Sequence, residues 1–135
     1  MALNMYMCLC VALSLSPAIN GGFMVGGYTN RDPNDAAITD AAKFSVQAYN
    51  EESNDVHFFK LGEIVSAQSQ VVAGINYKLI VEIGKTPCRK NHASDMHACD
   101  GDNTEVLQVL SCTFVVFQSL PPQSYSLTKH DCKPK

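Results

Sequence analysis

Residues 71–83 read Val71-Val72-Ala73-Gly74-Ile75-Asn76-Tyr77-Lys78-Leu79-Ile80-Val81-Glu82-Ile83. Apolar side chains occupy every second position of this segment, and more polar side chains fall between them. Such alternation is typical of a long antiparallel strand with one buried face. The segment therefore predicts a sheet, and the neighbouring segments indicate what packs on it.

A hairpin is expected at the start of this strand. A second strand-like run covers Phe58 to Gln68, and residues Ser69 to Gly74 connect the two runs. Gly74 can supply the positive φ that a tight hairpin often needs, and Gln70 can hydrogen-bond across the turn. The apolar residues Val71 to Ala73 are either an exposed binding edge or the buried start of the strand, and periodicity leaves both open.

A helix is expected before the first of these strands. Asp35 is a favourable N-cap, and the polar run from Asn50 to Asn54 ends the helix. Residues at a spacing of 3.6 share one face of this helix. That face carries Ile38, Ala41, Ala42, Ser45, Ala48 and Tyr49. The small alanines on it would let the helix lie close to a sheet.

The remaining segments complete an α+β layout. A Gly-rich stretch, Gly21 to Thr29, enters a short strand ahead of the helix, and Thr86 to Glu105 is a polar, exposed excursion. Val106 to Phe117 and Tyr125 to Cys132 are β-rich and are separated by Leu120-Pro121-Pro122-Gln123. The sequence therefore predicts an antiparallel sheet packed on a single helix.

The N-terminal residues 1–20 differ from the rest because none of them has a charged side chain. Their apolar run, Met5 to Leu15, is about eleven residues long, whereas a bilayer-spanning helix needs roughly 20. Small residues follow at Ser16-Pro17-Ala18. We expect a signal peptide cleaved between residues 18 and 21, leaving a secreted domain of residues 21–135. The n-region lacks Lys and Arg, so a buried N-terminal helix is the alternative.

Composition excludes several function classes. The net charge of −3 and the lack of a basic stripe give no footprint for nucleic acid, and no later segment could cross a membrane. Four cysteines remain after the signal segment, an even number in an oxidising compartment. They are Cys88, Cys99, Cys112 and Cys132. Sequence alone does not choose among their three pairings.

Metal binding and catalysis are not expected. His92 and His97 lie near Cys88 and Cys99 in the sequence, a composition that invites a zinc site. Oxidation to disulfides would remove both thiolates and leave two histidines. No separate arrangement of nucleophile and base is present, so neither a cofactor nor an enzyme activity is predicted. A small secreted metal-binding enzyme stays as a third hypothesis that a metal assay would test.

The hairpin residues resemble the cystatins. Gln70-Val71-Val72-Ala73-Gly74 matches their Gln-x-Val-x-Gly motif, and Gly26, in Met24-Val25-Gly26, lies where secreted (type 2) cystatins carry a glycine in the N-terminal arm. The segment from Cys112 to Phe117 resembles their fourth strand, and the four cysteines follow the type 2 pattern. The resemblance covers essentially the whole mature chain and implies a cystatin-like antiparallel sheet wrapped around one long helix.

The resemblance also implies a function and a mechanism. Cystatins inhibit papain-like cysteine proteases (cathepsins) reversibly and competitively, as a three-part wedge in the active-site cleft. Met24 and Val25 would fill substrate pockets, Gly26 would let the backbone bend, and Val71 to Gly74 would form the apolar centre. The type 2 pattern supports the pairs Cys88–Cys99 and Cys112–Cys132. The chain is expected to be a monomer that could form a domain-swapped dimer.

The second hairpin departs from the family. Cystatins carry Pro-Trp there, but this chain has no Trp. Alignment on the flanking cysteines places the dipeptide at Leu120-Pro121, and a one-residue shift places it at Pro121-Pro122. Buried Trp residues are frequent hot spots, so inhibition is expected to be weaker or differently selective. The alternative is a cystatin-fold binding or signalling module whose inhibition is weak or lost.

A second inhibitory site is suggested by Ser53-Asn54-Asp55. This triplet matches the loop through which some type 2 cystatins inhibit legumain, an Asn-specific protease. The resemblance therefore implies legumain as a second partner, with Asn54 as the contact residue. The structural alternative is a turn at the helix end, where Asn and Asp are common.

Overall fold

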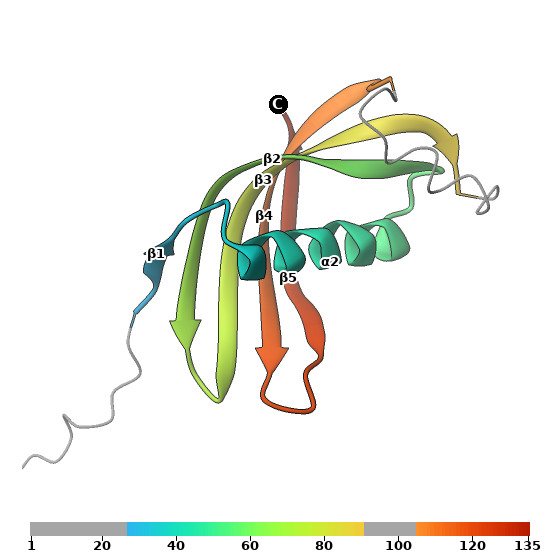
Figure 1. Ribbon diagram of the computed structural model, residues 1–135. Coiled ribbons are helices and arrows are strands. Elements are labelled where there is room, and N and C mark those ends of the chain that lie inside the picture. Colours follow the sequence, from blue (N-terminus) through green and yellow to red (C-terminus); the bar gives the residue numbers. More distant parts are fainter. Residues whose placement is uncertain (1–26, 91–104) are drawn as a thin grey trace, which may run out of the picture.

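The computed structural model describes residues 27–90 and 105–135 (Figure 1). The predicted signal peptide, the residues Met24 to Gly26 and the excursion containing His92, His97 and Cys99 lie outside the described residues. The elements in chain order are β1 (Thr29–Arg31), α2 (Ala36–Glu52), β2 (His57–Val71), β3 (Gly74–Arg89), β4 (Gln108–Ser119) and β5 (Tyr125–Pro134).

The five strands form one antiparallel sheet in the order β1-β2-β3-β4-β5. Figure 1 shows the sheet curving around α2, which lies across one of its faces. This arrangement confirms the predicted α+β fold, with one long helix held by an antiparallel sheet. None of the helical segments in the described part of the chain has the length and apolarity needed to span a membrane.

Helix α2 begins and ends as its sequence indicates. The Asp35 Oδ1 atom accepts a hydrogen bond from the backbone N–H of Ala37 at 3.1 Å, which caps the first turn. The Ser53 N–H closes the last turn on the Tyr49 carbonyl at 2.8 Å. The predicted face packs on the sheet, although Tyr49 is only half-buried. The buried helix residues are Ile38, Ala41, Ala42, Ser45, Val46, Ala48 and Asn50.

The alternation in residues 71–83 is confirmed from Ile75 onward, and its inward residues meet the apolar face of α2. The central residues Tyr77, Leu79, Val81 and Ile83 are buried, and Phe114 of β4 is fully buried beside them. Full burial of a Val, Leu, Ile or Phe side chain stabilises a fold by roughly 1.5–3 kcal/mol. The strand begins at Gly74, however, because Val71 belongs to β2 and the chain turns at Val72 and Ala73.

Irregular pairing in β2 lets the sheet curve around the helix. The register of β2 against β3 shifts between Leu61 and Ile64 and again between Ile64 and Ser66. Bulges of this kind bend a strand and increase its twist. Gly62 lies at the bend, where a Cβ would come within 2.9 Å of the Glu82 carbonyl oxygen. A glycine is therefore needed at this position to admit the neighbouring backbone.

Two buried polar residues tie the helix end and β3 to β2. The Asn50 amide donates to the Phe59 carbonyl at 2.9 Å and accepts from the Phe59 N–H at 2.8 Å. Thr86 is buried and donates to the Phe58 carbonyl at 2.8 Å. The prediction of an exposed excursion starting at Thr86 is therefore wrong for Thr86 to Arg89, which continue β3.

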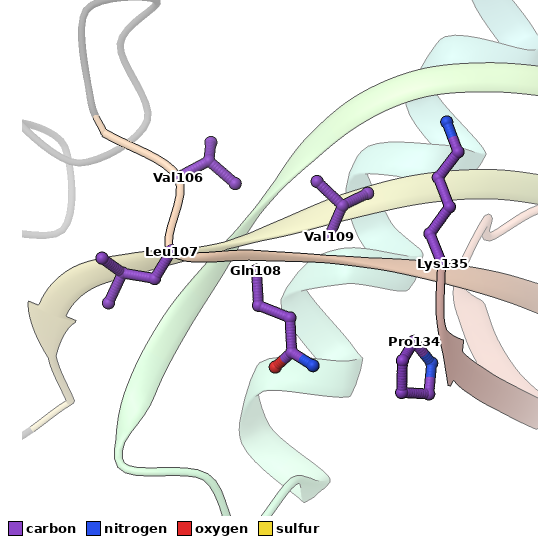
Figure 2. Close-up of a pocket in the computed structure, with 6 residues that line it drawn as sticks. All are labelled: Val106, Leu107, Gln108, Val109, Pro134 and Lys135. Carbon is purple, nitrogen blue, oxygen red and sulfur yellow. The ribbon is translucent and has the colours of Figure 1, made fainter.

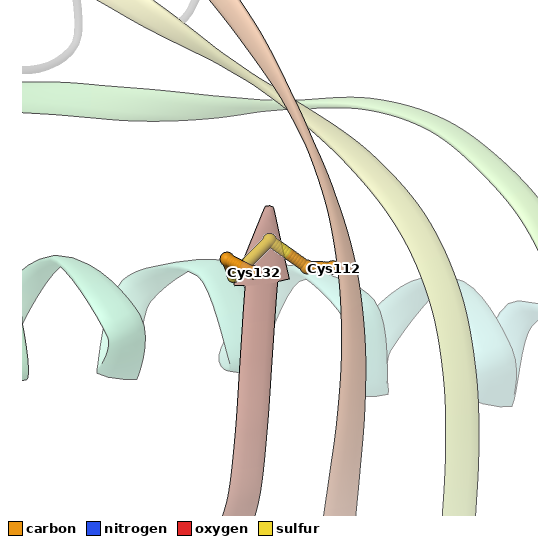
Figure 3. The surroundings of a disulfide bond; sticks show 2 residues. All are labelled: Cys112 and Cys132. Carbon is orange, nitrogen blue, oxygen red and sulfur yellow. A yellow bond between two sulfur atoms is a disulfide. The ribbon is translucent and has the colours of Figure 1, made fainter. Parts of the chain in front are cut away.

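One disulfide joins the last two strands. Cys112 and Cys132 are register partners, and Figure 3 shows their bond linking β4 to β5. This bond agrees with the second of the predicted pairs. Because it spans 20 positions of the sequence, loop-closure entropy alone would give it roughly 3 kcal/mol of stabilisation. Cys88 is also disulfide-bonded, whereas Cys99 lies beyond the described residues.

Candidate functional site

Two hairpin tips lie side by side at one end of the sheet. The β2–β3 turn and the β4–β5 turn both point toward the bottom of Figure 1. The register joins them, because Gly74 at the end of the first turn pairs with Ser119 at the start of the second. Residues that are more than forty positions apart therefore form one continuous edge.

The first tip is apolar and exposed. The Val71 side chain is 74 % exposed, Ala73 is exposed and Val72 is half-buried. The turn is held by a hydrogen bond from the Val72 N–H to the Gly74 carbonyl at 2.9 Å. At its base, the Asn76 amide donates to the Gln70 Oε1 atom at 3.5 Å, as expected of a glutamine that bridges the turn. The tip is thus an exposed edge and not the buried start of a strand.

Gly74 owes its place to packing. The prediction of a positive φ is wrong, since none of the glycines in the described residues has one. Gly74 is instead buried against β4, and a Cβ there would collide with the Gln118 carbonyl oxygen and lie 2.7 Å from the Phe117 ring atom Cζ. Only a residue without a side chain lets the two hairpins approach this closely.

The second tip exposes Leu120, Pro121 and Pro122. Leu120 is 62 % exposed and the two prolines are exposed after it. The turn is closed by serines: the Ser119 N–H donates to the Ser124 carbonyl at 2.9 Å, and the Ser124 N–H donates to the Ser119 hydroxyl at 3.0 Å. The apolar Leu120 side chain is therefore presented next to the first tip, directly before Pro121 and Pro122, the two positions at which the family's Trp would fall.

The N-terminal strand directs the chain toward the same end. Thr29 pairs with Ser69 and Arg31 with Ala67, so the residues before Thr29 run toward the tip of the first hairpin. Gly27 and Tyr28 are exposed there. The expected contact residues Met24, Val25 and Gly26 precede Gly27 and lie outside the described part of the chain.

Asn54 lies at the opposite end of β2, in a loop that is held on both sides. Asn54 is exposed, whereas the Ser53 hydroxyl accepts from the Asp55 N–H at 3.0 Å. The Lys90 ammonium donates to the Ser53 carbonyl at 3.0 Å. Asp55 forms an ion pair with Lys85 at 2.7 Å. The loop therefore presents one free asparagine between two anchored neighbours.

These contacts lower the pKa of the Asp55 carboxyl group. Burial by itself would raise the pKa of Asp55. The Lys85 ammonium and the His57 backbone N–H, which donates to Oδ1 at 2.9 Å, outweigh the burial and hold this pKa below its usual 3.8. Asp55 is therefore ionised over the whole physiological pH range and anchors the loop throughout it.

A shallow apolar depression lies at the other end of β4 from the hairpins (Figure 2). Its lining residues are Val106, Leu107, Gln108, Val109, Pro134 and Lys135. Lys135 carries the one ionisable side chain in this lining, and its ammonium forms an ion pair with the Glu82 carboxylate at 2.7 Å. Within residues 27–90 and 105–135, no three His, Cys, Asp or Glu residues gather in a way that could hold a metal ion.

Comparison with known proteins assigns the fold and the sequence to one family. The model of the cystatin domain matches residues 26–120. The chain is 38 % identical to Cystatin-2 of Crotalus adamanteus, covering 83 % of this chain and 82 % of that protein. It is 33 % identical to Cystatin-C of Mus musculus, covering 93 % of this chain and 89 % of that protein.

Solved structures agree with this assignment. Dimeric human cystatin F superposes with a TM-score of 0.69 at 30 % identity and covers 90 % of this chain and 97 % of its own. A salivary cystatin from the soft tick Ornithodoros moubata gives a TM-score of 0.67 at 24 % identity over 82 % of this chain and 99 % of its own. The second likeness concerns the fold alone.

Proposed function

This chain belongs to the cystatin family, and from that premise we propose that it is a reversible, competitive inhibitor of papain-like cysteine proteases (cathepsins). Its relatives are protease inhibitors and not enzymes, which agrees with the absence of a catalytic arrangement in the sequence. The observation that carries the proposal is the pairing of Gly74 with Ser119, which brings two apolar, exposed tips to one edge.

The proposed mechanism is a wedge that blocks the active-site cleft. Val71 to Gly74 would occupy the centre of the cleft, Leu120 to Pro122 one side, and Met24 to Gly26 the other. No bond of the inhibitor needs to break, because the wedge excludes substrate without presenting a carbonyl to the catalytic cysteine. The turns are preformed by the hydrogen bonds of Val72 and Ser119, which lowers the ordering cost of binding.

A titration of active-site-quantified papain with the mature chain tests this function. We expect a 1:1 complex that dissociates and that competes with substrate. Val71→Asp should raise the inhibition constant at least tenfold, because it puts a charge at the exposed apolar tip. Val65→Asp is the matched control, since Val65 is a 47 % exposed valine of the same strand that lies away from the tip.

Failure to inhibit papain would favour the alternative, a binding or signalling module with the cystatin fold. Equal effects of Val71→Asp and Val65→Asp would instead count against the hairpin tip as the contact surface. Both results differ from the expected one, so the titration separates the inhibitor from the module.

Secretion is part of the same proposal. We propose that residues 1–20 are a signal peptide and that residues 21–135 form the mature domain. The support is the short apolar run from Met5 to Leu15, which is followed by small residues. Mass spectrometry of the product secreted by eukaryotic cells should find an N-terminus between residues 19 and 22. We propose a monomer as the inhibitory form, with domain swapping through the first hairpin as the route to a dimer.

Legumain is the second proposed partner, and the loop of Asn54 favours it. Asn54 is exposed while Ser53 and Asp55 are anchored by Lys90 and Lys85, so the asparagine is offered in a fixed backbone. Asn54→Ala should abolish inhibition of legumain and leave inhibition of papain unchanged. Loss of both activities would mean that the substitution disturbs the fold and that the site is not separate.

A further inference from the structure

The chain that leads to the N-terminal arm, Met24 to Gly26, is held from both faces of the sheet. On the outer face, the Lys78 ammonium lies 5.8 Å from the centroid of the Tyr28 ring. On the helix face, the Arg31 guanidinium donates to the Asp35 carboxylate at 2.7 Å. The same guanidinium donates to the Ser69 hydroxyl at 3.1 Å. Side chains from β2, from β3 and from the N-cap of α2 therefore contact Tyr28 and Arg31 at the base of the arm.

These contacts compensate for a very short strand. Only Thr29 to Arg31 pair with β2, which is too little backbone pairing to fix the end of a strand firmly. Lys78 pairs with Gln68, and Gln68 pairs with Asn30, so Lys78 lies two strands away from β1. The Tyr28 ring therefore spans β2 to reach Lys78, and a cation at this distance from an aromatic face is attracted to it.

The residue before Tyr28 has no comparable restraint. A Cβ added to Gly27 would meet nothing within 4 Å. Gly27 is also free to adopt backbone conformations that other residues avoid. The contacts of the sheet therefore hold the chain from Tyr28 onward. Gly27, the residue before it, is the position at which the backbone dihedral angles are least restricted.

We propose that Tyr28 and Lys78 are positioning residues for the N-terminal arm. Their contact fixes the point at which the chain leaves the sheet, close to the tip of the first hairpin, so that the residues before it start from a defined place when a protease binds. This inference rests on the proposed inhibitory function. It assigns no protease contact to either residue, and it predicts that both act only through Met24 and Val25.

A double-mutant cycle tests the inference on the full mature chain. Tyr28→Ala and Lys78→Met should each weaken papain inhibition about two- to fivefold, which corresponds to a cation–π contact at a partly exposed site. The double variant should inhibit papain as well as the less effective of the two single variants, because both substitutions remove the same contact. Tyr28→Phe keeps the aromatic face and should inhibit like the unchanged chain.

The arm supplies the decisive background. In a chain carrying Met24→Gly and Val25→Gly, the arm has no side chains to place, so Tyr28→Ala should have no further effect. A loss that persists in this background would overturn the inference, because Tyr28 would then contact the protease directly. Additive losses from Tyr28→Ala and Lys78→Met, or no loss from either, would overturn it too.

A measurement without protease separates this inference from the proposed function. The heteronuclear NOE of the Tyr28 amide should fall in both Tyr28→Ala and Lys78→Met and stay unchanged in Tyr28→Phe, while the thermal midpoint stays the same in all three. An unchanged NOE would show that the contact between Tyr28 and Lys78 does not restrain the chain, even if inhibition is observed. A chain that does not inhibit papain but shows the expected NOE pattern would refute the proposed function, and the restraint by Tyr28 and Lys78 would stand.

Discussion

Gly74 is the residue at which the two hairpins are locked together. Its missing side chain leaves room for the Gln118 carbonyl oxygen and the Phe117 ring. The position lies between an exposed apolar tip and the second turn, so the fit of these two pieces depends on it. The requirement is a close approach of neighbouring chains and not an unusual backbone angle.

Gly74→Ala is therefore expected to change both stability and inhibition. A methyl group would force Phe117 and β4 aside, at a cost of about 1–3 kcal/mol in the free energy of unfolding. Urea unfolding measures this cost, and papain inhibition should weaken at least tenfold because the tips separate. Gly27→Ala is the control for stability, since its Cβ meets nothing within 4 Å. Equal losses of stability in the two variants would contradict the packing argument.

Asp55 makes the anchoring of the Asn54 loop dependent on pH. Its folded-state pKa lies below the usual 3.8, so its ion pair stabilises the fold above that pH. This contribution disappears as the pH falls through the lowered folded-state pKa. The ion pair of Asp55 thus stabilises the fold at pH 7 and is lost in strong acid.

Asp55→Ala should accordingly lower the free energy of unfolding at pH 7 by about 1 kcal/mol, the scale of one partly buried ion pair and its hydrogen bond. Urea unfolding at about pH 2 should show a smaller difference from the unchanged chain, because the ion pair weakens as the pH falls below the usual 3.8 and towards the lowered folded-state pKa. A difference of the same size at both pH values would show that the ion pair is not its cause.

Each hairpin makes a separate contribution at the level of the element. The first hairpin has an apolar tip, braced by hydrogen bonds of Val72 and Asn76. The second is equally well closed by Ser119 and Ser124, but it presents the aliphatic Leu120. The second hairpin therefore has the rigidity of a binding element without an aromatic anchor.

Leu120→Trp is expected to tighten papain inhibition about tenfold, which equals about 1.4 kcal/mol. Tryptophan buries more area than leucine and is enriched at interface hot spots. The control is Leu107→Trp, because Leu107 is 51 % exposed but lies at the far end of β4. If both variants inhibit like the unchanged chain, the second hairpin does not reach the protease.

The whole molecule has two candidate surfaces at opposite ends of β2. The hairpin tips lie where β2 ends at Val71, and the Asn54 loop lies just before β2 begins at His57. A 15-residue strand rises about 3.3 Å per residue, so its ends are roughly 45 Å apart along the chain. The two surfaces therefore share no residue and lie at opposite ends of the strand.

We accordingly predict a ternary complex of papain, this chain and legumain in a 1:1:1 ratio. Size-exclusion chromatography with light scattering should give the summed mass, and saturation with papain should leave the affinity for legumain unchanged. Displacement of one protease by the other would mean that the surfaces overlap. Asn54→Ala should reduce the assembly to the binary papain complex.

Local sequence patterns predicted the helix and the strands, with bounds that are off by a few residues and furthest off at the end of β3, which continues to Arg89. The Asp35 cap, the small residues on one face of α2 and the alternation from Ile75 to Ile83 are local patterns that burial requires. Such patterns survive without tertiary information because helix and strand periods repeat every few residues. The family motif at Gln70 to Gly74 was found in the same way, from contiguous residues.

Contacts between residues that are distant in sequence were found only in the folded chain. The register of Gly74 with Ser119, the clasp of Asn50 around Phe59 and the reach of Lys78 to Tyr28 join residues between 9 and 50 positions apart. No local pattern encodes these partners, because sheet register and curvature set which side chains meet. The sequence thus supplied a helix, strands and an apolar hairpin tip, and packing of the curved sheet made that tip part of one edge.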